Sequence, residues 1–240
     1  MPQIPELIEM LKNGVHFGHQ VSKRHPKMMP FIFGARNQIS IIDLEKTAEE
    51  LKKALDFVTK IVATDGVVLF VSSKDQAKDI VKKEATNCQM PFISSRWLGG
   101  TFTNFDNIIR LTNKLKELEQ QRESGELSKY TKKEQLDFER EITRLTDLVG
   151  GIKEMTTLPD AIFLVDIKKE KTALAEAKKV GVPTVAMVDA NDNPEKVNFP
   201  IPANNDAIKS IQMITELVSK AVIEGRGSKK VEELPVKKDK

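Results

Sequence analysis

Cysteine, tryptophan and tyrosine each occur only once in the 240 residues, and long apolar runs are absent. The single cysteine, Cys88, excludes an internal disulfide and a zinc site built from several cysteines, which fits a reducing compartment. The longest apolar runs, such as 67–71, have five residues, and the N-terminus has no basic segment followed by an apolar stretch. We therefore expect a cytoplasmic chain without a signal peptide or a membrane span, and we expect Cys88 in the core.

Acidic residues are missing from one long segment near the N-terminus. The net charge of +3 is the small difference between 38 basic and 35 acidic residues, yet residues 10–42 contain no Asp or Glu. All three histidines and five Lys or Arg residues fall there, among glycines and prolines that predict loops and turns. Such a positive field favours a phosphate backbone, and the interleaved Phe17, Phe31 and Phe33 suit RNA. The alternative is a basic loop that only favours solubility.

Short apolar runs alternate with amphipathic helices in most of the chain. Residues 67–71 and 161–165 are apolar at every position, as buried parallel strands are, and 182–188 is similar. Apolar residues between such runs recur at spacings of three and four, for example in 44–62. The alternation predicts an α/β fold with a doubly wound parallel sheet. Asp43 and Asp206 are expected to cap the helices that follow them.

The charged stretch 103–150 predicts an antiparallel coiled-coil hairpin inserted into the α/β domain. Apolar residues alternate at three and four on both sides of a break at 124–125, and boxes beginning at Thr103 and Thr131 would start the two helices. A nearly neutral hairpin of this kind is more typical of a strut or a protein-docking arm than of an active site. The expected domains are a discontinuous α/β unit at 1–102 and 151–225, the hairpin at 103–150, and a disordered basic tail at 226–240.

The loop 91–105 joins these two parts of the chain. It holds the only tryptophan, three phenylalanines, the pair Gly99-Gly100 and a lone Arg96. The loop is interpreted either as a buried aromatic plug alone or as a plug whose arginine also contacts a phosphate.

An enzymatic function is the competing hypothesis. Ligands of doubly wound sheets bind at the carboxyl ends of the strands, where Lys74, Asp166 and Asp189 would meet. That trio would suit a magnesium-dependent phosphate-ligand enzyme or a receiver-like domain, although an Asp after a buried strand is commonly a cap or a loop anchor. The phosphate-binding and nucleophile motifs G-x-x-x-x-G-K-[ST], G-x-G-x-x-G and G-x-S-x-G do not occur. His16 and His19 could also approach Asp189 and Asp206 and hold a metal.

Several motifs resemble the bacterial type of the small-subunit ribosomal protein two family. They are G-V-H-F-G-H at 14–19, P-K-M at 26–28, F-G-A-R-N at 33–37, I-I-D-L at 41–44, R-W-L-G-G-T at 96–101 and L-P-D-A at 158–161. The resemblance implies a flavodoxin-like fold with the inserted hairpin, no catalysis, no required cofactor and no small-molecule substrate. It also implies a structural role in translation, with small-subunit ribosomal RNA and neighbouring ribosomal proteins as partners, and help in docking ribosomal protein one.

Two departures from the family pattern affect the expected sites. Asn205 stands where the family usually has a carboxylate, so the expected zinc or magnesium set is reduced to His16, Asp189 and Asp206. His25 stands where a tryptophan is frequent. The residues expected to contact RNA are Lys12, Lys23, Arg24, His25, Lys27, Arg36, Asn37, Arg96, Trp97 and Asn104.

Overall fold

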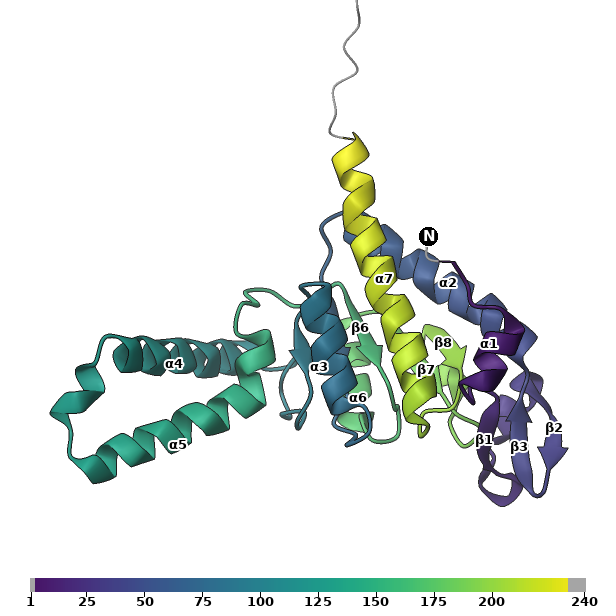
Figure 1. Cartoon of the computed structure of the whole chain (residues 1–240), viewed down its shortest axis with the longest axis horizontal. Helices are drawn as coiled ribbons and strands as arrows, with labels where there is room; N and C mark the ends of the chain where they lie inside the picture. The colour runs from purple at the N-terminus through teal and green to yellow at the C-terminus, as the bar shows by residue number, and fades with distance from the viewer. Residues whose placement is uncertain (1–2, 233–240) are drawn as a thin grey trace, which may run out of the picture.

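The computed structural model describes residues 3–232, and a five-stranded parallel sheet forms its centre (Figure 1). The strands lie in the order β5-β4-β6-β7-β8, which by chain order is the 2-1-3-4-5 arrangement of flavodoxin-like sheets. The predicted α/β class and parallel sheet are therefore confirmed. The strands are β4 (Val68–Val71), β5 (Phe92–Ile93), β6 (Ala161–Leu164), β7 (Thr184–Val188) and β8 (Phe199–Pro202).

Helices cover both faces of the sheet, and this explains why its central strands are apolar at every position. Val68 and Phe70 of β4 belong to one hydrophobic core, whereas Leu69 and Val71 belong to the other, because successive side chains of a strand point to opposite faces. The first core packs under α2 (Leu44–Ala63), α3 (Lys78–Asn87) and α7 (Ile208–Glu232), and Cys88 is buried there as expected. The second core packs under α6 (Lys171–Val180).

The acid-free segment, for which loops and turns were predicted, folds into a small antiparallel sheet. This sheet has the order β1-β3-β2 and follows the short helix α1 (Leu7–Lys12). Asn37 and Gln38 have positive φ angles of 49° and 62°, so a two-residue turn joins the last two strands. The elements are β1 (Phe17–Gln20), β2 (Ile32–Arg36), β3 (Ile39–Ile42) and the 3-10 helices η1 (Val21–Lys23) and η2 (Pro26–Phe31).

Two long helices form an arm that leaves the globular body opposite the small sheet (Figure 1). They are α4 (Phe105–Glu123) and α5 (Lys132–Val149), joined by η3 (Glu126–Lys129) and followed by η4 (Gly150–Ile152). Buried apolar residues lie on both helices, including Leu115 and Leu118 on the first and Ile142 and Leu145 on the second. After the arm, the chain passes close to β5 at Gly151. A Cβ at this position would collide with the carbonyl oxygen of Phe92, so the close approach requires glycine.

Local signals at helix ends were predicted with mixed success. The caps at Asp43 and Thr131 are confirmed, the second as a complete capping box. The predicted cap at Asp206 is wrong, because Asn204 Oδ1 accepts hydrogen bonds from the backbone N–H groups of Asp206 and Ala207 instead. The predicted box at Thr103 is also wrong, since α4 begins at Phe105 without a side-chain cap.

Helix α7 extends further than expected. It ends at Glu232, so residues 226–232 are helical, where a disordered tail was predicted. Residues 233–240 of that prediction lie outside the described part of the chain. Among the described residues, no helix is both long enough and apolar enough to cross a membrane.

Candidate nucleic-acid interface

Most of the predicted RNA-contacting residues gather around the small sheet. Lys12 ends α1, Lys23 ends η1, Arg36 ends β2, and Asn37 is the first residue of the β2–β3 turn. The backbone N–H of Val21 donates to Gln38 O at 2.9 Å, which holds the segment after β1 against this turn. The side chains of Lys12, Lys23, Arg36 and Asn37 are exposed, and Arg24 is half-buried.

His25 and Lys27 connect the small sheet to the large one. The backbone N–H of His25 donates to Ala190 O at 2.9 Å, in the loop after β7, and its Nδ1 accepts from the backbone N–H of Lys27. Lys27 Nζ lies 2.7 Å from Glu195 Oε1, in η5 (Pro194–Lys196). Lys27 is thus the one predicted phosphate contact in the described chain that a carboxylate already neutralises in part.

The other predicted contacts lie at the base of the arm, far from the small sheet (Figure 1). Arg96 and Asn104 are exposed, but Trp97 is only 7% exposed and its ring packs edge-on against Phe102 at a centroid distance of 5.0 Å. Most of the indole is therefore covered by the protein itself, and an RNA contact at Trp97 stays a prediction. The buried-plug interpretation of this loop is correct for Trp97 and Phe102.

Glu176 of α6 organises this loop, and sequence reasoning missed it. Its Oε1 accepts from Trp97 Nε1 at 3.2 Å and from Gly100 N at 2.8 Å, and its Oε2 accepts from Phe102 N at 2.9 Å. Burial raises the pKa of Glu176, but these hydrogen bonds outweigh burial and hold the pKa below its ordinary value. A glutamate on the same helix face as Ala173 and Ala177 was the available signal.

A lysine occupies the carboxyl edge of the sheet where an enzyme would bind a ligand. Lys74 Nζ lies 2.5 Å from Asp206 Oδ1, 3.3 Å from Asp166 Oδ2 and 2.6 Å from the carbonyl oxygen of Asn205. Asp166 Oδ1 accepts from two backbone N–H groups, those of Lys168 and Lys169, as a loop anchor does. The predicted meeting of Lys74 and Asp166 is correct, and the contacts of Lys74 are with other residues of the chain.

His19, and not His16, lies between the two predicted metal-binding carboxylates. His19 Nδ1 is 3.0 Å from Asp189 Oδ2, and its Nε2 is 3.5 Å from Asp206 Oδ2. Gly18 allows this approach, because a Cβ there would collide with Ala190. The ring of His16 packs beside Phe17 instead, and burial lowers its pKa. The set of His16, Asp189 and Asp206 is therefore replaced by one with His19.

The geometry around His19 suits a proton better than a metal ion. One ring nitrogen faces each carboxylate, whereas a single ion could take only one of those nitrogens. The hydrogen bond to Asp189 raises the pKa of His19. A protonated imidazole would face both carboxylates. One ligand atom from each of His19, Asp189 and Asp206 also lies within 4.8 Å of the others, which is close enough to hold a metal ion in place of the proton.

We expect the His19→Gln substitution to lower stability more at pH 6 than at pH 9. A raised folded-state pKa means that protonated His19 stabilises the fold below its unfolded pKa of about 6.5, and that this contribution is lost as pH rises through the folded value. Urea unfolding of both chains at the two pH values measures the difference. A zinc-dependent rise in melting temperature that His19→Gln abolishes would contradict this interpretation.

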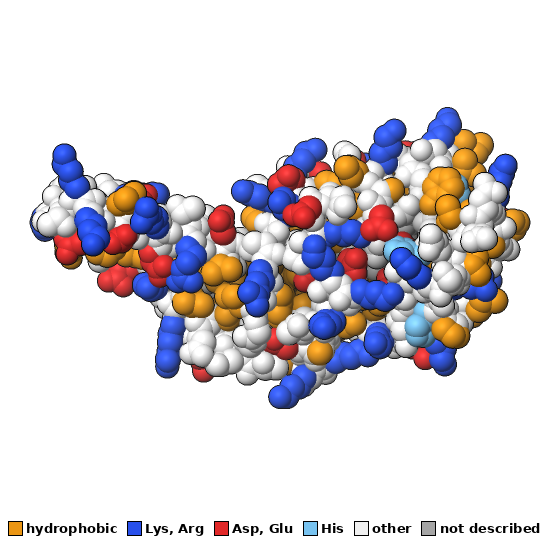
Figure 2. All heavy atoms as spheres, turned by 90° about the horizontal axis from the view of Figure 1, so that it is seen from below, with side chains coloured by type: hydrophobic (Ala, Val, Ile, Leu, Met, Phe, Trp, Pro, Cys, Tyr) orange, Lys and Arg blue, Asp and Glu red, His pale blue; other side chains and the backbone are white. Residues whose placement is uncertain are grey.

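Figure 2 views the molecule from the side on which the parallel strands end, and basic side chains are spread over this face with acidic ones between them. The fold is therefore that of a doubly wound α/β protein with a helical arm. The carboxylates at the strand ends contact other residues of the chain, and the basic side chains face solvent.

A family model described as ribosomal protein S2 matches residues 10–225. Proteins named small ribosomal subunit protein uS2 from two strains of Dehalococcoides mccartyi are 49% identical over 226 residues, which cover 94% of this chain and 92% of each relative.

The chain therefore belongs to the ribosomal protein S2 family. This membership confirms the resemblance seen in the motifs and the predicted structural role in translation, in the small ribosomal subunit. The family is one of structural ribosomal proteins, and the match favours this role over the enzymatic alternative.

Proposed function

We propose that the chain binds small-subunit ribosomal RNA through the basic surface of its small sheet. The observation that carries the proposal is the exposure of Lys12, Lys23 and Arg36 on a segment that contains no acidic residue from 10 to 42. Exposed guanidinium and ammonium groups without nearby carboxylates are available to phosphate oxygens. Arg96 and Asn104, at the base of the arm, form a second group of contacts on the same RNA.

The salt dependence of RNA binding tests this proposal. Arg36→Gln and Arg96→Gln should each lower the slope of log K against log salt by about one unit, because each removes one phosphate contact. Lys27→Gln should lower it less, since Glu195 lies 2.7 Å away and already competes for the ammonium group. Filter binding to small-subunit ribosomal RNA at several salt concentrations gives the slopes.

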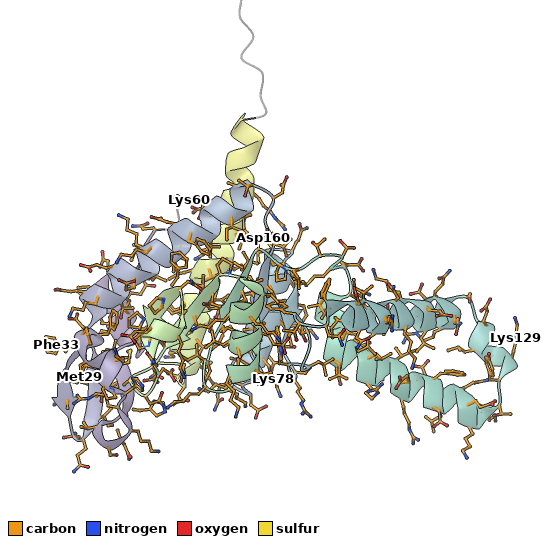
Figure 3. The ribbon with its side chains drawn as sticks, turned by 180° about the vertical axis from the view of Figure 1, so that it is seen from behind. Met29, Phe33, Lys60, Lys78, Lys129 and Asp160 are labelled. Carbon is orange, nitrogen blue, oxygen red and sulfur yellow. The ribbon has the colours of Figure 1, made fainter. Side chains whose placement is uncertain are left out.

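Lys60→Gln provides the matched control for these variants. Lys60 is exposed on α2, at the opposite end of that helix from Met29 and Phe33 of the small-sheet region (Figure 3). For the Lys60→Gln chain, the slope of log K against log salt should equal that of the unmodified chain. Equal slopes for Arg36→Gln, Arg96→Gln and Lys60→Gln would refute the proposed interface.

We further propose that α4 and α5 form a coiled-coil docking arm for a neighbouring protein, with ribosomal protein one as the partner that the resemblance implies. The support is a shared apolar seam along the two helices and a surface of exposed ion pairs, such as Lys114 with Glu141 at 2.8 Å. Such surface pairs contribute little to folding and leave the outer faces free for a partner. The predicted division into an α/β unit and a 103–150 module remains part of this proposal.

Truncating the arm should separate docking from folding. Replacing residues 121–137 by a short glycine linker removes the tip but keeps Leu115, Leu118, Ile142 and Leu145, all of which are buried. The variant should melt cooperatively near the melting temperature of the full chain and lose binding to purified ribosomal protein one. Replacing all of 103–150 should instead destabilise the chain, because Ile108 and Val149 belong to the same core as Leu69. Non-cooperative melting of the shorter truncation would contradict a modular arm.

A further inference from the structure

A cavity of about 440 Å³ lies beside the carboxyl ends of β6 and β7. Its walls come from three parts of the chain, which are the loop after β6 with the start of α6, the loop after β7 with η5, and His25. The volume falls in the range of roughly 300–1,000 Å³ that is usual for small-ligand sites. Of the residues that line the cavity, only His25 is among the residues expected to contact RNA.

The lining combines an apolar surface with a basic rim. Ile167 and Leu174, each 5% exposed, and Ala175 supply the apolar surface. The cationic residues of the lining are Lys168, Lys171, Lys178 and Lys196. These lysines are exposed, and none of the four forms a close ion pair with another residue in the part of the chain that the structure describes. Such a lining fits a ligand with one flat apolar part and at least one anionic group.

Two oxygens of the lining lack a hydrogen-bond donor. They are Asn191 Oδ1 and Asp192 Oδ1, and Asp192 is only 1% exposed. A buried acceptor without a partner costs free energy, and a ligand N–H group would remove that cost. Both oxygens are closed off from water in the free chain, so the side chains would have to turn toward the cavity on binding. Cytosine, adenine and guanine carry an exocyclic amino group that offers such donors, whereas uracil offers only a ring N–H.

The ring of His25 adds a flat surface to this lining. Its Nδ1 is engaged by the backbone N–H of Lys27, which fixes the orientation of the imidazole. Aromatic and imidazole rings commonly stack on unpaired bases of RNA. The cavity also lies between the two proposed groups of RNA contacts, since His25 belongs to the small-sheet region and α6 holds the aromatic loop through Glu176.

We propose that this cavity binds one unstacked nucleotide with an amino-bearing base. The base lies between His25 and the surface formed by Ile167, Leu174 and Ala175, and its phosphate lies on the lysine rim. The ligand chemistry is that of a cytidine, adenosine or guanosine nucleotide, from an RNA strand or from the free pool. The RNA source rests on the function proposed above, whereas the free source does not.

Amide shifts of the isotope-labelled full chain test the pocket without RNA. CMP should shift residues 167–178 and 191–196 in a saturable manner, and UMP should bind about three- to tenfold more weakly because it lacks the amino donor. Ala175→Phe, which fills the apolar surface from an exposed helix position, should abolish the CMP shifts. Thr172→Phe, exposed on the same helix but outside the lining, should keep them. If Ala175→Phe unfolds, the paired change Lys171→Gln and Lys178→Gln serves instead, with Lys179→Gln as its control.

Chemical probing of the complex with small-subunit ribosomal RNA tests the other source. The unmodified chain should protect one unpaired cytosine, adenine or guanine from dimethyl sulfate, and Ala175→Phe should restore its reactivity and keep the other protections. If CMP binds but no nucleotide of the RNA is protected in this way, the pocket is assigned to free nucleotides. Three results would overturn the proposal. They are equal shifts with CMP, UMP and inorganic phosphate, shifts with oligoglutamate equal to those with CMP, and no effect of Ala175→Phe in both experiments. Failure of the chain to bind the RNA at all would refute the proposed function, while the CMP titration would still decide the pocket.

Discussion

Replacing Glu176 with alanine should lower the free energy of unfolding by about 3–5 kcal/mol, because several buried donors would lose their acceptor at once. Glu176 is 8% exposed and receives hydrogen bonds from the indole of Trp97 and from the backbone N–H groups of Gly100, Phe102 and Thr103. Each unsatisfied donor would cost about 1–3 kcal/mol if it stayed buried, and some would regain water as the loop opens. Urea unfolding measures the loss.

The pH dependence gives this prediction a specific signature. Since the folded-state pKa of Glu176 is held below its ordinary value, its stabilising contribution is present above the unfolded pKa and is lost as pH falls through the folded one. The alanine variant should therefore lose less stability on acidification than the unmodified chain does.

Two further variants control for side-chain loss and for charge. Glu154→Ala removes a carboxylate that is 77% exposed and lies 3.0 Å from Lys116, so it should change stability by about 0.5 kcal/mol or less. Glu176→Gln keeps one acceptor oxygen, so its loss in free energy of unfolding should lie between the losses of the two alanine variants. If Glu176→Ala unfolded at the same urea concentration as Glu154→Ala, the loop would have to be held by its ring packing alone.

The sheet could be predicted from sequence because its signal is local. Strands covered on both faces are apolar at every position, and β4 and β6 are buried along their whole length. The capping box at Thr131 was also predictable, since all of its atoms come from four consecutive residues. These elements would be recognisable in any chain with the same pattern.

The errors arose where a partner distant in sequence decides the outcome. Thr103 has the spacing of a capping box with Asp106, but its hydroxyl lies 3.3 Å from Glu176 Oε2 and α4 begins later. His16 and His19 are equivalent in the sequence, and only the approach of Gly18 to Ala190 selects the second. The small sheet was missed because two 3-10 helices separate its first two strands and the pairing of its strands is irregular in register.

Changing Arg24 and Arg36 together to glutamine should abolish most binding to small-subunit ribosomal RNA and leave melting nearly unchanged. Neither guanidinium forms an ion pair or a side-chain hydrogen bond with another residue in the described part of the chain. Arg36 is exposed and Arg24 is half-buried, and unpaired charges near the surface contribute little to folding but much to phosphate binding. The slope of log K against log salt should fall by about two units, one for each lost contact.

Asp166→Asn should have the opposite profile. Asp166 anchors the loop after β6 by accepting from Lys168 N and Lys169 N, each at 2.9 Å. Losing its charge should cost about 1 kcal/mol of stability, as a weakened cap does. RNA binding should survive, because the carboxylate faces Lys74 and not a phosphate. The two variants thus separate a folding role from a binding role at residues of opposite charge.

Cosedimentation of tagged chains with small ribosomal subunits tests the assignment of RNA binding to the basic surface most directly. Subunits assembled with the Asp166→Asn chain should carry it at the level of the unmodified chain, whereas the Arg24→Gln, Arg36→Gln chain should remain in the unbound fraction although it melts normally. Loss of the Asp166→Asn chain from the subunits, together with full incorporation of the paired arginine variant, would contradict the proposal that the segment from 10 to 42 carries the binding.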